Sequence, residues 1–115
     1  MNNRVIKKVV ISTGAVTTLA GSGNSSFLDG TGTNASFKSA LGIATDGTNL
    51  YVSDYLKIRK IVISSGVVTT IAGSNTIESI DGTGTNASFF WIGRQFTSDG
   101  TYLYVTDYNI IRRVE

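Results

Sequence analysis

The chain has 115 residues, 41% apolar and 16% charged, with ten basic against eight acidic side chains and a formal net charge of +2. This length suits one domain with its own core, and so small a basic excess falls short of the clustered charge that binding to nucleic acid requires. The sequence has no cysteine and no histidine. Disulfides and thiolate metal sites are therefore excluded, and the commonest general base of enzymes is missing.

The first predicted elements are two strands, "RVIKKVVI" at residues 4–11 and "AVTTLAG" at residues 15–21. Their apolar run is far shorter than the roughly 20 residues that span a bilayer, so we predict no contact with a membrane. Thirteen glycines, no proline and many threonines and valines favour strands joined by turns along the whole chain.

The phrase "DGTGTNASF" follows at residues 29–37, and it returns unchanged at residues 81–89. Asp29 and Asp81 are predicted to close turns by accepting hydrogen bonds from their own backbone, with nearby glycines at positive φ. A calcium site is the alternative, but each phrase offers one carboxylate where a calcium loop supplies several. We therefore expect no metal and no other cofactor.

Four strands are predicted between the two phrases, at residues 41–45, 50–54, 57–64 and 67–73. Short turns such as "DGTN" and "SG" join them, so neighbouring strands should pair antiparallel. Both faces of this unit are fairly apolar and need cover on both sides. A four-stranded unit covered in this way is a propeller blade.

The chain repeats itself with a period of 52 to 53 residues. Residues 5–37 match residues 57–89 at about two-thirds of positions, and "TDGTNLYVSDY" at residues 45–55 matches "SDGTYLYVTDY" at residues 98–108. A period of this length is typical of stacked or radial supersecondary units rather than of an enzyme domain of mixed architecture.

The repeat divides the chain into parts of a single repeat domain. Phe37 and Phe89 end the two phrases and are predicted to fill the space between successive blades. A first, a second and a short third strand are predicted in residues 95–114. The parts are a partial blade at residues 1–37, a full blade at residues 38–89 and a partial blade at residues 90–115.

Charged residues recur at fixed places in each period. Asp54 precedes Arg59 by five residues, Asp107 precedes Arg112 by the same spacing, and Lys7 holds the place of the arginine near the N-terminus. We predict that each pair forms a salt bridge or turn clamp inside its blade. The three copies of the third strand, at residues 4–11, 57–64 and 110–115, hold eight of the ten basic residues. These residues form either a stripe for an anionic partner or a solvated strand that resists aggregation. Alternation with isoleucine and valine favours the solvated strand, so no nucleic-acid partner is predicted.

The second period departs from the first at "FFWIGRQF". It gains Phe90, Trp91, Arg94 and Gln95 at the entry to an inner strand. These residues form either a ligand site, for a glycan or a protein, or an aromatic plug against a neighbouring blade.

The segments "GIATDGTNLYVSD", "IRKIVISSGVVTTIAGS" and "DGTGTNASF" resemble the NHL repeat of β-propellers, in its highly repetitive bacterial form, over nearly the whole chain. The resemblance implies four-stranded blades in a ring, typically of six, that binds protein, nucleic acid or other ligands, and some relatives are enzymes. The family usually has Asn-x-Pro before the inner strand, where this chain has "KSALG" and "FWIGRQ". Its turn between the second and third strands is longer than "YLK" or "YN", so no site is carried over there.

We therefore expect an all-β, non-enzymatic propeller module of about two blades per chain that completes a ring with copies of itself. Three chains would give the six blades that the resemblance implies, and four chains, giving eight, are the second choice. We expect residues 4–11 to take the third-strand place in the joint blade, leaving residues 110–115 at an edge. A ligand-binding propeller that uses residues 89–95 is the alternative function.

Overall fold

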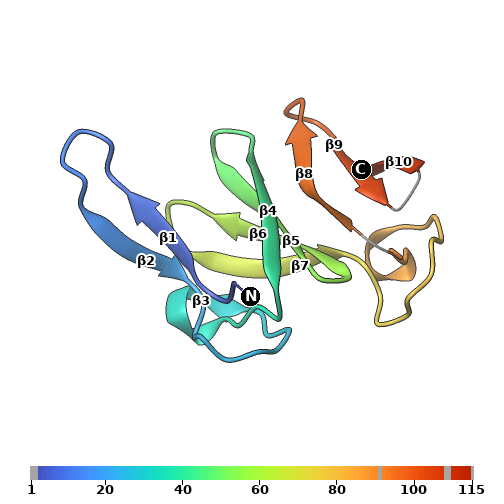
Figure 1. Ribbon diagram of the computed structural model, residues 1–115, viewed down its shortest axis with the longest axis horizontal. Helices are drawn as coiled ribbons and strands as arrows, with labels where there is room; N and C mark the ends of the chain where they lie inside the picture. Colours follow the sequence, from blue (N-terminus) through green and yellow to red (C-terminus); the bar gives the residue numbers. More distant parts are fainter. Residues whose placement is uncertain (1–2, 91, 108–109, 115) are drawn as a thin grey trace.

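The computed structural model describes residues 3–90, 92–107 and 110–114, with the backbone alone for Arg94 and Gln95. These residues form ten strands and two single-turn 3₁₀ helices, η1 (Gly32–Asn34) and η2 (Gly84–Asn86) (Figure 1). None of the described helices has the length and apolar character to cross a membrane. The strands are β1 (Ile6–Val9), β2 (Val16–Ala20), β3 (Gly30–Thr31), β4 (Ala40–Thr45), β5 (Asn49–Asp54), β6 (Lys57–Val62), β7 (Val67–Ala72), β8 (Ile92–Ser98), β9 (Leu103–Asp107) and β10 (Ile110–Val114).

The described strands form three antiparallel sheets that follow one another along the chain. The first pairs β1 with β2, the second has the order β3-β7-β6-β5-β4, and the third has the order β10-β9-β8. Figure 1 shows the first hairpin, the middle sheet and the third sheet in succession, with β4 and β8 side by side. The prediction of an all-β fold is confirmed.

The middle sheet has one strand more than the sequence predicts. Strands β4 to β7 match the four predicted strands to within two residues at each end. The fifth strand, β3, belongs to the first repeated phrase, where Gly30 faces Val68 and Thr31 faces Val67 of β7. The phrase is therefore partly sheet, because β7 offers it a free edge at which its backbone groups are satisfied.

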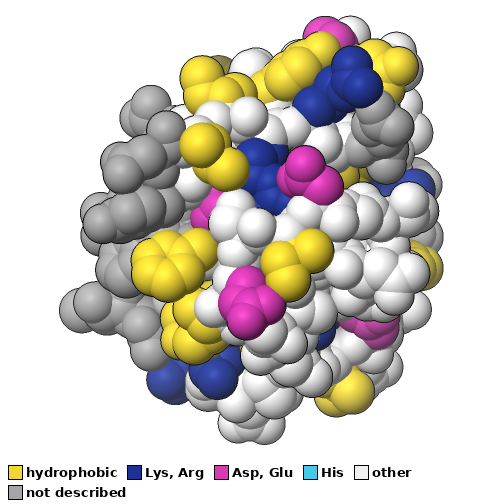
Figure 2. All heavy atoms as spheres, turned by 90° about the vertical axis from the view of Figure 1, so that its right-hand side faces the viewer, with side chains coloured by type: hydrophobic (Ala, Val, Ile, Leu, Met, Phe, Trp, Pro, Cys, Tyr) yellow, Lys and Arg dark blue, Asp and Glu magenta, His cyan; other side chains and the backbone are white. Residues whose placement is uncertain are grey.

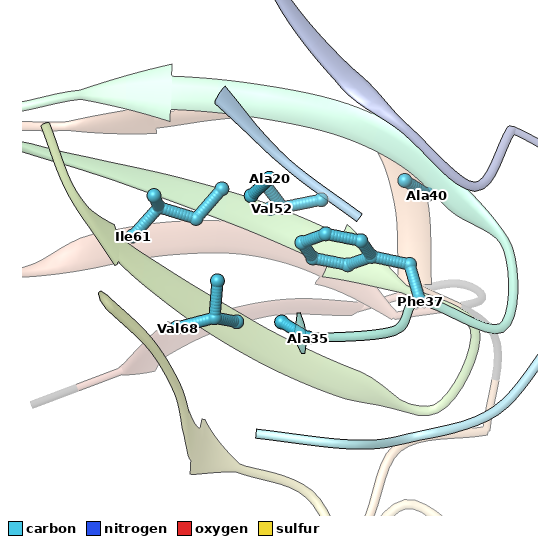
Figure 3. Packing of buried hydrophobic residues seen from close by; sticks show 7 residues of the cluster. All are labelled: Ala20, Ala35, Phe37, Ala40, Val52, Ile61 and Val68. Atoms are coloured by element: carbon cyan, nitrogen blue, oxygen red, sulfur yellow. The ribbon is translucent and has the colours of Figure 1, made fainter. Parts of the chain in front are cut away.

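Apolar side chains fill the spaces between successive sheets. One cluster brings Ala20 of β2 against Phe37, Val52, Ile61 and Val68 (Figure 3). The other brings residues of the middle sheet against residues of the third: Ile58, Ala72, Phe89, Ile92, Leu103 and Val105. Both phenylalanines that end the repeated phrases are buried in these clusters. Ile58 and Ile61 of β6 thus serve different clusters, and the middle sheet is covered on both faces.

Glycine is required where β2 and β7 end. Gly21 and Gly73 have φ of 108° and 103°, which L side chains rarely adopt. A Cβ on Gly73 would also collide with the carbonyl oxygen of Leu56, and a Cβ on Gly21 with that of Arg4. The chain therefore leaves β2 and β7 against the backbone just before β1 and β6, a close approach that no larger residue permits.

Candidate functional site

Arg59 holds the first repeated phrase against the middle sheet. Its Nη1 donates to Oδ2 of Asp54 at 2.8 Å and to the carbonyl oxygen of Ser36 at 2.9 Å. Its Nη2 donates to the carbonyl oxygen of Leu28 at 2.9 Å and to Oδ1 of Asp29 at 3.1 Å. Arg59 and Asp54 are fully buried. An ion pair removed from water in this way is tolerated because hydrogen bonds satisfy both carboxylate oxygens of Asp54 and both Nη atoms of Arg59, although Nε of Arg59 is buried without a partner.

Asp29 makes its hydrogen bonds to the sheet, which corrects the prediction that it bonds its own turn. Its Oδ1 accepts from Oγ1 of Thr70 at 2.9 Å, and its Oδ2 accepts from the Thr70 backbone nitrogen at 3.2 Å. Thr70 lies on β7, next to β3, and Arg59 lies on β6. The Asp29 carboxylate therefore ties the phrase to both β6 and β7, because the pairing of β3 with β7 brings it beside these strands.

The same arrangement recurs around Arg112 in the third sheet. Its Nη1 donates to Oδ2 of Asp107 at 2.9 Å and to the carbonyl oxygen of Ser88 at 2.6 Å. Its Nη2 donates to the carbonyl oxygen of Ile80 at 2.7 Å and to Oδ1 of Asp81 at 2.8 Å. The spacing of the aspartate and arginine in each period thus leads to a buried ion pair in both sheets.

The two arginines correct the prediction of a solvated basic strand. Arg59 and Arg112 each lie about 5 Å from the ring centre of the phenylalanine that ends their phrase, at 5.0 Å from Phe37 and 4.9 Å from Phe89. Both are buried and direct their hydrogen bonds to groups of the same chain, so they do not form a solvated surface. The solvated interpretation holds for the exposed lysines of β1.

A groove of about 880 Å³ opens beside β10. Its apolar lining comes from Ala72 of β7, from Ala87 and Phe89 of the second phrase, and from Ile111 and Val114 of β10. Figure 2 looks onto this side of the molecule, where hydrophobic side chains surround a basic and an acidic side chain in contact. The groove is thus apolar in part, with an ion pair at its margin.

The repeat explains the groove. Ala87, Phe89 and Val114 line the groove. Their equivalents one period earlier, Ala35, Phe37 and Ile61, share a buried cluster with Val68 of β7. In the middle sheet, β7 lies between β6 and β3, whereas in the third sheet β10 is the edge strand. The groove therefore corresponds in position to the space that β7 fills one period earlier. It is the candidate functional site.

The predicted ligand site at the entry to β8 is described in part. Phe90 is 43% exposed, and its backbone nitrogen donates to Oδ1 of Asp107 at 2.9 Å. Trp91 lies outside the described residues, as do the side chains of Arg94 and Gln95 on β8. The structure thus locates Phe90 beside the buried ion pair of Asp107 and describes none of the other three side chains.

A tyrosine that the sequence-based predictions did not include supports the Asp-Gly turns at Asp46 and Asp99. Oδ1 of Asp46 accepts from the backbone nitrogens of Asn49 at 2.7 Å and Thr48 at 3.0 Å, and Oδ2 accepts from the Tyr51 hydroxyl at 2.8 Å. These donors, the Asn49 nitrogen foremost, hold the pKa of Asp46 well below its ordinary value. The pKa of Asp99 is lowered for the same reason in the next period. The Asp-x₄-Tyr spacing recurs in both periods and is the sequence pattern from which this contact could have been predicted.

The described part of the chain offers no cluster of metal-binding side chains. No three histidine, cysteine, aspartate or glutamate side chains gather there in a group that could hold an ion.

Comparison with known proteins informs the fold. No protein-family model matches the chain, and no curated protein matches it. The chain is similar to the solved structure of a structural genomics protein of unknown function from Bacteroides thetaiotaomicron VPI-5482, with a TM-score of 0.82 and 24% sequence identity. The match covers 95% of this chain and 29% of that one. The chain thus spans less than a third of that protein's length, and the likeness concerns the fold alone.

Proposed function

We propose that the chain is a non-enzymatic structural module, an NHL-like propeller segment that assembles with copies of itself into a closed ring. The observation that carries the proposal is the difference between two equivalent strands. β6 is flanked by strands on both sides, while β10 has β9 on one side and the groove on the other. A strand edge beside apolar surface is a template for pairing with another chain.

Exposed apolar side chains at the two ends of the stack of sheets add support. Ile11 and Val16 of the first hairpin are 99% and 58% exposed, and Ile110 and Ile111 of β10 are 51% and 78% exposed. Joining the first sheet of one chain to the third sheet of another would bury both sets.

The geometry of such a contact sets the number of chains. The two joined surfaces differ, so the contact is head to tail, and it closes only if the rotation per chain divides a full turn. Three chains of about two blades each give the six-bladed ring that the resemblance implies. Four chains give eight blades and are the second choice.

The test compares the full chain with a variant that lacks residues 1–22, which removes both strands of the first sheet. Light scattering should give the full chain a mass near three times 12.2 kDa. The shortened chain, checked for retained β-structure by circular dichroism, should not assemble. A full chain that is monodisperse and stable as a monomer contradicts the proposal.

A further inference from the structure

We propose that the groove beside β10 receives β2 of a partner subunit of the same sequence, and that Thr18 of the partner subunit donates two hydrogen bonds to Asp81. This inference rests on the proposed self-assembly and names the contact through which it occurs. It assigns a binding site to the groove and a role in the interface to Asp81.

The middle sheet is the template for this contact. There β7 pairs with β6 so that Arg59 faces Thr70 and Ile61 faces Val68, and Gly30 of β3 faces Val68 from the other side. The groove offers equivalents of both neighbours. β10 repeats the residue pattern of β6, and Gly82 stands in the second phrase where Gly30 stands in the first.

β2 already pairs in the register that the groove requires. Within one chain it faces β1, and Lys7 lies opposite Thr18 as Arg59 lies opposite Thr70. The register shift next to this pair is also the same in both hairpins. Transferred to the groove, this register puts Thr18 of the partner subunit opposite Arg112.

Asp81 lacks hydrogen bonds that its equivalent, Asp29, makes to the neighbouring strand. Asp29 and Asp81 both bind an arginine Nη2, at 3.1 Å and 2.8 Å. Asp29 also accepts two hydrogen bonds from Thr70, and its side chain is 50% exposed, whereas that of Asp81 is 98% exposed. Thr18 is the equivalent of Thr70, 52 residues earlier. It therefore carries the two donors that would complete the hydrogen bonds of Asp81.

The arginine decides which third strand stays in the joint blade. Arg112 is 8% exposed, and both of its terminal nitrogens, Nη1 and Nη2, donate hydrogen bonds. A lysine ammonium does not reproduce this planar pair of donors. Lys7 on β1 is exposed, and its Nζ donates to Oγ1 of Thr18 at 2.8 Å. We therefore assign the third-strand position of the joint blade to β10, so that β1 of the partner subunit does not pair there. This replaces the sequence-based expectation that residues 4–11 take that place.

Cysteine cross-linking tests the proposed register of β10 against β2 of the partner subunit. The chain has no cysteine of its own, so only the introduced pair can form a disulfide. The template puts Arg113 opposite Thr17 of the partner subunit, as Lys60 lies opposite Thr69. Residues opposite one another on antiparallel strands lie within reach of a disulfide. The double variant T17C/R113C, mildly oxidised, should give covalent oligomers up to a trimer on a denaturing gel, and a reductant should return them to monomer.

The matched control is K60C/T69C, which should cross-link within a chain and leave the covalent mass unchanged. If T17C/R113C stays monomeric on the gel while light scattering still reports a trimer, the docking is wrong and the self-assembly stands. If the parent chain is itself a monomer, both proposals fail.

A second pair of variants tests the hydrogen bonds. Asp81→Ala should weaken association by about tenfold or more, because two hydrogen bonds to a charged group are lost across the interface. Asp29→Ala removes the same bonds inside one chain, so it should lower the melting temperature and leave association unchanged. Equal association of both variants, each shown to be folded by circular dichroism, would overturn the role of Asp81.

Discussion

At the scale of single residues, Arg59 and Arg112 explain how irregular backbone is held against a sheet. Each guanidinium donates to two carbonyl oxygens of its loop and to two carboxylates, one before the third strand and one in the repeated phrase. A group with five donors in a fixed plane is suited to four acceptors at once. The loops thus depend on one residue of the third strand in each period.

The sequence predicts part of this arrangement and not the rest. The five-residue spacing of Asp54 and Arg59 recurs in the next period, so their pairing follows from the repeat itself. The partner of Asp29 does not follow, because Thr70 is 41 residues away and comes near only when β3 pairs with β7. Contacts within a turn can be predicted locally, whereas contacts that depend on sheet order cannot.

The Asp46 turn predicts a pH dependence. Its folded pKa is lowered below the ordinary value of 3.8, so the folded chain binds fewer protons than the unfolded chain as the pH falls past that value. The stability from this turn is therefore complete above about pH 5 and is lost progressively below it. In urea titrations, Asp46→Asn should lower the free energy of unfolding at pH 7 and reduce its decline between pH 5 and pH 2.

Tyr51→Phe is the graded control for this prediction. It removes one donor from Asp46 and keeps both backbone donors. Its decline with falling pH should lie between those of the parent and Asp46→Asn. Parallel curves for all three proteins would show that Asp46 does not carry the pH dependence.

At the scale of strands, alternation and turn residues predict where strands lie and say little about their edges. The four strands between the phrases were predictable because Asp-Gly and Ser-Gly turns separate runs rich in valine and isoleucine. β3 was not, because "GTGT" has the composition of a turn and becomes a strand only through its partner. The identity of an edge strand is likewise a property of the sheet order and is absent from local composition.

The close approach at the end of β7 gives a prediction at this scale. Gly73 and Gly47 both have positive φ, 103° and 93°, but a Cβ on Gly47 meets nothing within 4 Å. Gly73→Ala adds a collision with backbone to the conformational strain. It should therefore cost roughly 1–3 kcal/mol more than Gly47→Ala in the free energy of unfolding measured with urea. Similar costs at both sites would mean that the Leu56 carbonyl moves aside freely.

At the scale of the whole molecule, apolar layers between sheets require a neighbour at each end. The middle sheet is covered on both faces, while the first and third sheets carry exposed isoleucine and valine side chains. In the proposed ring, copies of the chain would supply this neighbour at each end. We propose that ring closure completes the core of this protein.

Small-angle X-ray scattering tests ring closure most directly, because one curve gives both the mass and the size of the particle in solution. A closed ring predicts the mass of three 12.2 kDa chains and a radius of gyration well above the 13.6 Å of the single chain's Cα atoms. These values should stay constant over a wide concentration range. A particle with the mass of one chain and a radius of gyration close to 13.6 Å would contradict the proposed ring.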